Sequence, residues 1–267
     1  MKTAILLVAY GTSSPQGRGS LRQFDAWVRE RFPGICVRWA LSSELLRTRL
    51  TRARQKNDSV LKALRRLCLE NFTHVAVQPL QIIPGSEHTD VRADADEAGR
   101  LDGLHVSIGT PLLACDEDIR AAAQAVLAHL PEERRADEDV VLMGHGNDRG
   151  PGDLTLAATA AAFHKADPHV WLATVEGSNS FDNVLPKLKA SGAKRVWLQP
   201  FMIVAGDHAN NDLAGPEEDS WASRIKAAGM TPMPNLKGLG QLKGIQDIFL
   251  SHTQNAVVDL ANTKKAD

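Results

Sequence analysis

The sequence has few of the features that stabilise small secreted proteins or anchor a chain in a membrane. It has 3 cysteines in 267 residues, Cys36, Cys68 and Cys115, which lie far apart among apolar residues. This pattern is typical of reduced thiols, and without a C-x-x-C pair it argues against a thiolate zinc site. No apolar run approaches the ~20 residues of a membrane-spanning helix. The short apolar run 3–9 has no cleavage site after it and predicts a first strand rather than a signal peptide, hence a cytoplasmic protein.

An excess of charge of one sign is also missing. The chain has 31 Lys and Arg against 32 Asp and Glu, so its formal net charge is −1. Without a long-range positive field, a nucleic-acid binder that depends on bulk charge is not indicated. The glycine patterns at 11–17 and 144–146 lack the spacing of nucleotide-binding loops, and there is no G-x-S-x-G of serine hydrolases.

Short apolar runs alternate with amphipathic stretches along most of the chain. The runs lack a clean alternation of polar and apolar residues, which is typical of strands buried on both faces of a parallel sheet. Strands are predicted at residues 3–9, 36–41, 74–80, 105–108, 139–143, 170–175, 195–203 and 231–235. Helices are predicted at residues 20–31, 59–71, 91–98, 116–130, 154–165, 184–191 and 219–228.

This alternation predicts an α/β protein made of two domains, each with a parallel four-stranded sheet. The polar, acidic segment 131–139 is the predicted linker. It divides the chain into an N-terminal domain, 1–134, and a C-terminal domain, 135–267, whose last helix is free to pack back on the first domain.

The two domains are related by an internal repeat. Residues 74–88 align with 195–209, and residues 7–12 align with 142–147. The alignment places Tyr10 on His145 and Glu87 on His208. These positions follow strands, at the sheet edge where open α/β sheets bind ligands. If the two copies face each other, the four side chains converge on one cleft.

Three residues at strand ends could carry chemistry. His145 lies between two glycines, His208 follows Gly206 in a second loop, and Glu176 ends a third strand. Two imidazoles and a carboxylate suit a divalent transition metal with open coordination positions. They suit proton abstraction equally well. The alternative is that each is an incidental polar residue at the end of a strand.

Two further features have open interpretations. His88, next to Glu87, is either a ligand from the opposite wall or a solvent-facing loop residue. The stretch 47–66 is either a solvated helical face or an electropositive rim for a polyanionic small molecule. Nucleic acid is the third choice for it, because no aromatic residues interleave with the cations. Its cations are Arg47, Arg49, Arg52, Arg54, Lys56, Lys62, Arg65 and Arg66.

Several longer motifs occur together over nearly the whole chain. They are AILLVAYGT at 4–12, QPLQIIPGSE at 78–87, MGHG at 143–146, TVEG at 174–177, PFMIVAGDHANND at 200–212, EDSW at 218–221 and LKGLG at 236–240. Through them the sequence resembles the anaerobic-pathway sirohydrochlorin cobaltochelatases, class II chelatases of cobalamin biosynthesis. The resemblance implies two Rossmann-like domains around a tetrapyrrole cleft. It also implies ATP-independent insertion of Co²⁺ with some tolerance for Fe²⁺, and no cofactor beyond the substrate metal.

The resemblance assigns roles to single residues. The family's two metal-site histidines fall on His145 and His208, and its cleft glutamate falls on Glu87. Glu176 corresponds to a further metal ligand in some members. The expected metal ligands are therefore His145, Glu176 and His208, and the expected catalytic residues are His145, Glu87 and His208. The expected substrate-binding residues are Tyr10, Thr12, Ser13, Arg18 and His88.

The partners implied are sirohydrochlorin and Co²⁺, with no nucleic acid and no membrane. Sirohydrochlorin is a polycarboxylate, which gives Arg18 and the stretch 47–66 a reason to line the cleft. Two alternatives stay open: an iron chelatase for sirohaem or haem at the same site, and a non-catalytic tetrapyrrole or metal carrier with His88 as an axial haem ligand. The sequence leaves open the metal preference in the cell, a homo-oligomeric state and the group that accepts the pyrrole protons.

Overall fold

The computed structural model describes residues 2–55, 57–101, 103–147 and 150–262. The chain forms two compact units: unit 1 comprises Met1–Ser13, Leu21–Ala114 and Gln246–Asp267, and unit 2 comprises Ser14–Ser20 and Cys115–Ile245. The division between them differs from the sequence-based boundary at 134/135. Helix α5 (Asp116–Leu127) belongs to unit 2 because it packs against α6 (Pro151–Ala166). Most of the last helix, α9 (Lys243–Asn262), belongs to unit 1.

Unit 1 contains a parallel four-stranded sheet in the order β2-β1-β3-β4. Its strands are β1 (Thr3–Ala9), β2 (Cys36–Leu41), β3 (His74–Pro79) and β4 (His105–Ile108). Its other helices are α1 (Pro15–Arg31), whose first residues are grouped with unit 2, α2 (Glu44–Arg52), α3 (Val60–Leu69) and α4 (Ser86–Ala98).

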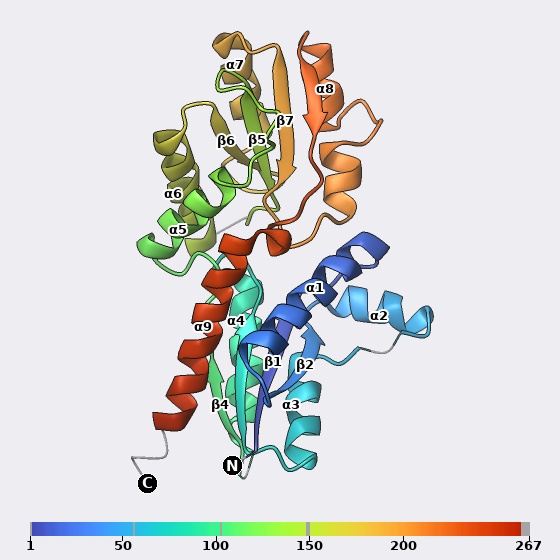
Figure 1. Ribbon diagram of the computed structural model, residues 1–267. Helices are drawn as coiled ribbons and strands as arrows, with labels where there is room; N and C mark the ends of the chain where they lie inside the picture. The colour runs from blue at the N-terminus through green and yellow to red at the C-terminus, as the bar shows by residue number, and fades with distance from the viewer. Residues whose placement is uncertain (1, 56, 102, 148–149, 263–267) are drawn as a thin grey trace. The chain divides into compact units, whose positions relative to one another are not determined.

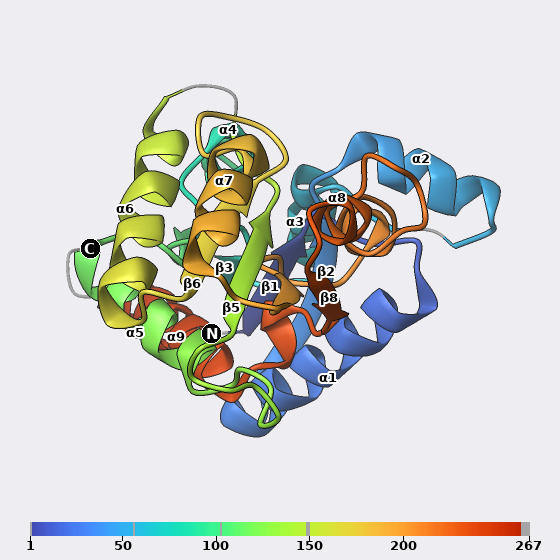
Figure 2. The same cartoon turned by 90° about the horizontal axis from the view of Figure 1, so that it is seen from above.

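Unit 2 repeats this arrangement, with a parallel sheet in the order β6-β5-β7-β8. Its strands are β5 (Asp139–Gly144), β6 (Val170–Thr174), β7 (Arg195–Pro200) and β8 (Thr231–Pro234). Its remaining helices are α7 (Phe181–Ser191), α8 (Trp221–Ala227), the π-helical turn η1 (Ala209–Leu213) and the 3₁₀ turn η2 (Leu239–Gln241). Strand β5 lies between α6 and α8 in both views (Figures 1 and 2). The predicted α/β class with two parallel four-stranded sheets is confirmed.

Each sheet is buried on both faces, as the continuous apolar strands require. In unit 1 one face of β1 packs against α3 and α4 through Leu64 and Val91, while Phe24 of α1 meets Phe249 of α9 edge to face at 5.9 Å. In unit 2 one face of β5 packs against α7 and α8. Over the described ranges, no helix combines the length and the apolar character needed to cross a membrane.

The repeat extends to the pairing register of the strands. Leu7 of β1 pairs with Gln78 of β3, and the aligned Leu142 of β5 pairs with Gln199 of β7. The turns after β1 and β5 also match, because Gly11 and Gly146 both have a positive φ, +107° and +97°. Glycine adopts such a φ without the steric cost that other residues incur. The two units therefore share a backbone frame in which the strand-end positions correspond.

Four helices, α1, α4, α6 and α7, begin earlier than the sequence pattern predicts, and the difference is largest for α1 and α4. Helix α1 begins at Pro15 rather than residue 20, because Ser14 accepts a hydrogen bond from the Gly17 amide (2.9 Å) and Pro15 suits the first helical position. Helix α4 begins at Ser86 rather than residue 91. The predicted loop that carries Glu87 and His88 is therefore the first turn of a helix.

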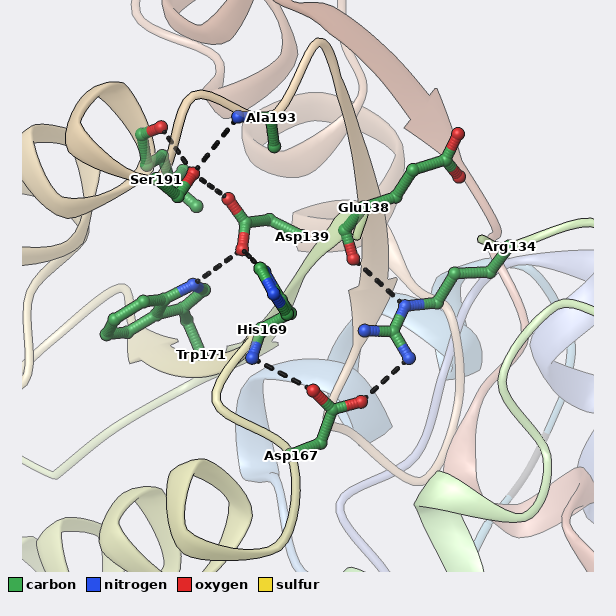
Figure 3. A network of polar contacts seen from close by, with 9 residues as sticks. Arg134, Glu138, Asp139, Asp167, His169, Trp171, Ser191 and Ala193 are labelled. Atoms are coloured by element: carbon green, nitrogen blue, oxygen red, sulfur yellow. Dashed lines mark hydrogen bonds and ion pairs between the residues drawn. The ribbon is translucent and has the colours of Figure 1, made fainter. Parts of the chain in front are cut away.

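Polar residues link the amino ends of β5 and β6 in unit 2 (Figure 3). The Asp139 side chain is fully buried and accepts hydrogen bonds from Trp171 Nε1 (3.2 Å) and the Ser191 hydroxyl, and His169 Nδ1 lies 3.0 Å from it. Nearby, Arg134 forms an ion pair with Asp167 (2.8 Å). Burial raises the pKa of Asp167, but hydrogen bonds from Arg134 and the His169 amide outweigh it, so this pKa is lowered overall. The network stabilises the sheet edge opposite the strand-end loops.

Candidate functional site

His145 projects from the carboxyl end of β5 in unit 2. It directly follows Gly144, the last residue of the strand, and its side chain is 52% exposed. Gly146 keeps the neighbouring loop close, since a Cβ at this position would lie 1.9 Å from the Glu176 carbonyl oxygen. The two glycines thus leave the imidazole uncovered at the sheet edge.

Glu176 is held beside His145 by the backbone. Its amide donates to the His145 carbonyl (2.9 Å), which continues the pairing of β5 and β6 past the ends of these strands. Asp153 of α6 anchors the loop by accepting hydrogen bonds from the Ser178 amide (3.2 Å) and hydroxyl (2.7 Å). Glu176 Oε2 lies 3.9 Å from His145 Nδ1, which is too far for a hydrogen bond.

His208 lies immediately before the π-helical turn η1, beyond the end of β7. Ala209 and Leu213 of this turn are fully buried and fix it to the core of unit 2. The His208 ring meets the His145 ring edge to face, with 4.9 Å between the centroids. Its Nδ1 lies 2.5 Å from Asp212 Oδ2. π-Helical turns are rare and occur frequently at functional sites.

The structure therefore brings together the three predicted metal ligands, His145, Glu176 and His208, as neighbours of one another. They form contacting pairs rather than a closed cluster. In the part of the chain that the structure describes, no group of three or more His, Cys, Asp or Glu side chains is arranged to hold a metal ion.

Glu87 occupies the aligned position in unit 1, in the first turn of α4. The Ser42 hydroxyl donates to its carboxylate (3.2 Å), and Gln81 Nε2 lies 3.5 Å from the same hydroxyl. Burial raises the pKa of Glu87 to about 6, although the hydrogen bond from Ser42 opposes this shift. A carboxyl group with such a pKa can exchange protons near neutral pH.

His88 is buried on α4 and is not the solvent-facing loop residue that one interpretation of the sequence expects. Burial lowers its pKa, with a smaller contribution from Arg92, which favours the neutral imidazole. Its Nδ1 is buried and makes no hydrogen bond to any described residue. A role for His88 in binding substrate or haem stays a prediction.

The other predicted substrate-binding residues differ in exposure. Tyr10 is 53% exposed directly after β1, whereas Thr12 is buried. Ser13 and Arg18 are half-buried, and Arg18 lies on α1. Their contact with substrate stays a prediction, as does the meeting of Tyr10 and Glu87 with the histidines in one cleft.

Part of the basic stretch 47–66 has structural partners. Arg47 donates to the carbonyls of Leu41 (2.5 Å) and Ser42 (2.7 Å) at the end of β2. Ion pairs join Lys62 and Arg66 to Asp58, and Arg65 to Glu97. The side chains of Arg52 and Arg54 are exposed, and Lys56 lies outside the described residues. The structural interpretation thus applies to Arg47, Lys62, Arg65 and Arg66, and the electrostatic interpretation of the exposed cations stays a prediction.

Asp212, Ser42 and Asp153 support the site and were not singled out from the sequence. Asp212 lies four residues after His208, a spacing that brings two side chains together on a helical turn. That spacing was a usable signal once a turn was expected there. Nothing local in the sequence connects Ser42 with Glu87 or Asp153 with Ser178.

Comparisons with known proteins show which family the sequence matches. A family model described as cobalt chelatase (CbiK) matches residues 3–258. The chain is 48% identical over 257 residues to the sirohydrochlorin cobaltochelatase CbiKC of Nitratidesulfovibrio vulgaris, covering 96% of this chain and 91% of that protein. It is 31% identical over 265 residues to the sirohydrochlorin cobaltochelatase of Salmonella typhimurium, covering 96% and 97%.

Solved structures share the fold. SirB from Bacillus subtilis with Fe³⁺ has a TM-score of 0.66 at 15% identity, and the match covers 99% of this chain and 98% of that one. The sirohydrochlorin chelatase SirB of a Bacillus subtilis subspecies, in complex with cobalt, has a TM-score of 0.64 at 14% identity, covering 98% of each chain. At these identities the likeness concerns the fold alone.

Proposed function

The chain belongs to the cobalt chelatase family, and from this premise we propose that it is a sirohydrochlorin cobaltochelatase, an enzyme that inserts Co²⁺ into sirohydrochlorin. The observation that carries the proposal is the contact of two half-exposed imidazoles, His145 and His208, beside the Glu176 carboxylate. Imidazole nitrogens and a carboxylate suit a divalent transition metal with open positions.

His145 and His208 would hold the substrate metal, with Glu176 completing the set. Only the neutral form of an imidazole binds a metal, so Co²⁺ binding would weaken as the histidines become protonated at low pH. Exposed ligands favour both halves of the task, because the ion must be taken from water and then released to the macrocycle. Fe²⁺ would occupy the same ligands, and metal availability would decide between them in the cell.

Glu87 would accept protons from the pyrrole nitrogens. Metallation releases two N–H protons from the macrocycle, so a base is required. With a pKa of about 6, the Glu87 carboxylate is mostly ionised at pH 7 and still basic enough to take up a proton. Ser42, which donates to it at 3.2 Å, would keep its oxygens oriented.

Substrate capture would use an aromatic side chain and basic side chains that are exposed or half-buried. Tyr10 offers an aromatic face, and Arg18, Arg52 and Arg54 would attract the carboxylates of sirohydrochlorin. Thr12, Ser13 and His88 complete the predicted substrate-binding residues. The expected cytoplasmic location belongs to the same proposal.

The test is a spectroscopic metallation assay with sirohydrochlorin and either Co²⁺, Fe²⁺ or Ni²⁺. We expect many turnovers per protein molecule with Co²⁺, and a slower reaction with Fe²⁺. A protein that copurifies with a Soret band and binds tetrapyrrole without turnover would instead be a carrier. Faster turnover with Fe²⁺ than with Co²⁺ would make it an iron chelatase.

A further inference from the structure

The candidate site in unit 2 contains one more carboxylate, Asp212. It lies outside the aligned segments of the repeat and is not one of the expected metal ligands. Asp212 Oδ2 lies 2.5 Å from His208 Nδ1, at the end of the π-helical turn that follows His208. We propose that Asp212 is a positioning residue: it fixes the ring and the tautomer of His208 so that Nε2 faces the substrate metal. The proposal rests on the proposed function, because it takes His208 to be a metal ligand.

The hydrogen bond determines which nitrogen can bind a metal. An ionised carboxylate only accepts hydrogen bonds, so Nδ1 of His208 carries the proton and donates it to Asp212. Nε2 is then the nitrogen with the free lone pair. Metal-bound histidines commonly donate a hydrogen bond from the N–H of their second ring nitrogen to a carboxylate, which fixes the ring and makes the ligand more basic.

The turn itself is built to hold the two side chains together. His208 and Asp212 are four residues apart and half-exposed, whereas Ala209 and Leu213, also four residues apart, are fully buried. The Asn210 side chain donates to the Gly206 carbonyl (2.8 Å) and fixes the start of the turn. Gly215 allows the exit, because a Cβ there would lie 2.3 Å from the Asn211 carbonyl oxygen. The turn therefore fixes the backbone positions from which the two side chains meet.

His145 differs from His208 in this respect. Its Nδ1 lies 3.9 Å from Glu176 Oε2, so the nearby carboxylate does not fix its ring by a hydrogen bond. One imidazole of the pair is therefore preorganised and the other can rotate. A metal that must be bound and then handed on would be well served by one fixed and one adjustable ligand.

The experiment measures Co²⁺ binding without tetrapyrrole, by calorimetry and by proton NMR of the Co²⁺-loaded protein. The variants are Asp212→Ala, Asp212→Asn, His208→Ala and, as a matched loss of an exposed acid in the following loop, Glu218→Ala. In the wild type we expect a paramagnetically shifted ring N–H signal of His208 that exchanges slowly with water and is missing in His208→Ala.

Asp212→Ala should lower the Co²⁺ affinity about 10-fold and make this N–H exchange rapidly, since carboxylates behind metal-bound histidines typically contribute 10- to 100-fold. Asp212→Asn keeps an oxygen acceptor and should retain the signal with an intermediate affinity. Circular dichroism checks that each variant is folded. If Asp212→Ala is not folded, the results for Asp212→Asn test the proposal.

The experiment distinguishes failure of the proposed function from failure of the positioning role of Asp212. If His208→Ala binds Co²⁺ as the wild type does, His208 is not a metal ligand and the proposed function loses its site. If His208→Ala loses affinity while both Asp212 variants keep the affinity and the slow exchange of the wild type, the positioning role is overturned and the metal site stands.

Discussion

Each unit places one side chain after its first strand and another in the turn beyond its third strand, and the two pairs have different chemistry. Unit 1 has Tyr10 and Glu87, and unit 2 has His145 and His208. The strands that lead to these side chains match, since Leu7–Gln78 and Leu142–Gln199 pair in one register. The difference shows that a duplicated frame preserves where side chains emerge while leaving their chemistry free to diverge.

The surroundings have diverged along with the side chains. Glu87 begins a regular α-helix and is half-buried against Ser42, which raises its pKa to about 6. His208 precedes a π-helical turn and remains 42% exposed beside Asp212. Burial suits a group that takes up a proton, whereas exposure suits a group that must meet a hydrated metal ion.

The opposite edges of the sheets differ as well. Asp139 at the start of β5 has three side-chain partners, whereas the aligned Ala4 of β1 is a fully buried apolar residue. Unit 2 therefore has a buried carboxylate where unit 1 has an apolar side chain at the aligned position.

The largest effect is expected where the aligned side chains differ most. His145→Ala should lower the metallation rate by about 100-fold or more, because a ligand or proton-transfer group at the reacting centre is lost. Tyr10→Ala, at the aligned position, should lower it far less. The fold should survive both changes because both side chains are about half-exposed. Initial metallation rates and thermal unfolding are measured for both variants. Equal losses of rate would contradict the expected difference in role between His145 and Tyr10.

The second aligned pair should separate metal binding from proton transfer. Glu87→Gln should slow single-turnover metallation about 100-fold and leave Co²⁺ affinity unchanged, since it removes a base and keeps the shape. His208→Ala should weaken Co²⁺ binding measured without substrate. Calorimetric titration of both variants with Co²⁺ measures the difference. An equal loss of Co²⁺ affinity would mean that both residues are metal ligands.

At the opposite edge, Asp139→Ala should lower the free energy of unfolding by about 3 kcal/mol, because it removes the hydrogen bonds that the buried Asp139 carboxylate accepts from Trp171 and Ser191. Asp137→Ala, which removes an exposed acid two residues earlier, should change it by less than about 0.5 kcal/mol. Urea unfolding at pH 7 gives both values. Similar values for the two variants would show that the network contributes little.

A smaller effect is expected from Ser42→Ala. The wild-type rate should rise with pH through about 6 as Glu87 loses its proton and becomes a base. Ser42 stabilises the charged carboxylate, so its removal should raise the pKa of Glu87 and move this rise to higher pH. The profile of kcat/KM from pH 5 to 8 measures the shift. With Co²⁺ saturating at each pH, so that protonation of the histidine ligands does not limit the rate, Glu87→Gln should lack this rise. If it keeps the rise, another group is titrating.

The smallest effect should come from the exposed cations of unit 1. Reversing Arg52 and Arg54 to Glu should lower kcat/KM several-fold at low ionic strength, and added salt should narrow the difference. Arg100→Glu, beyond the end of α4, is a matched reversal of another exposed cation and should have less effect. If reversal of Arg52 and Arg54 changes kcat/KM no more than reversal of Arg100, and salt has no influence, the stretch 47–66 is a solvated face.

Local sequence signals predicted the strands better than the first residues of the helices. The strands were predictable because continuous Val, Ile and Leu runs bury both faces of a sheet, and all eight occur where the pattern puts them. Strand β7, however, ends at Pro200 rather than at residue 203. The starts of α1 and α4 were missed because a serine cap before Pro15, and the glycine before Ser86, are weaker signals than apolar periodicity.

The two four-stranded α/β domains, their repeat, and the choice of His145, Glu176, His208 and Glu87 as candidate site residues could be predicted from the sequence. These predictions follow from patterns that lie within short stretches of chain. The folded structure was needed to show which of these residues touch, that His88 is buried, and that Ser42 and Asp212 contact Glu87 and His208. Such pairings depend on how turns close and how distant strands pack. Burial and hydrogen bonds then set the proton affinity of each group, and these properties arise only when the chain has folded.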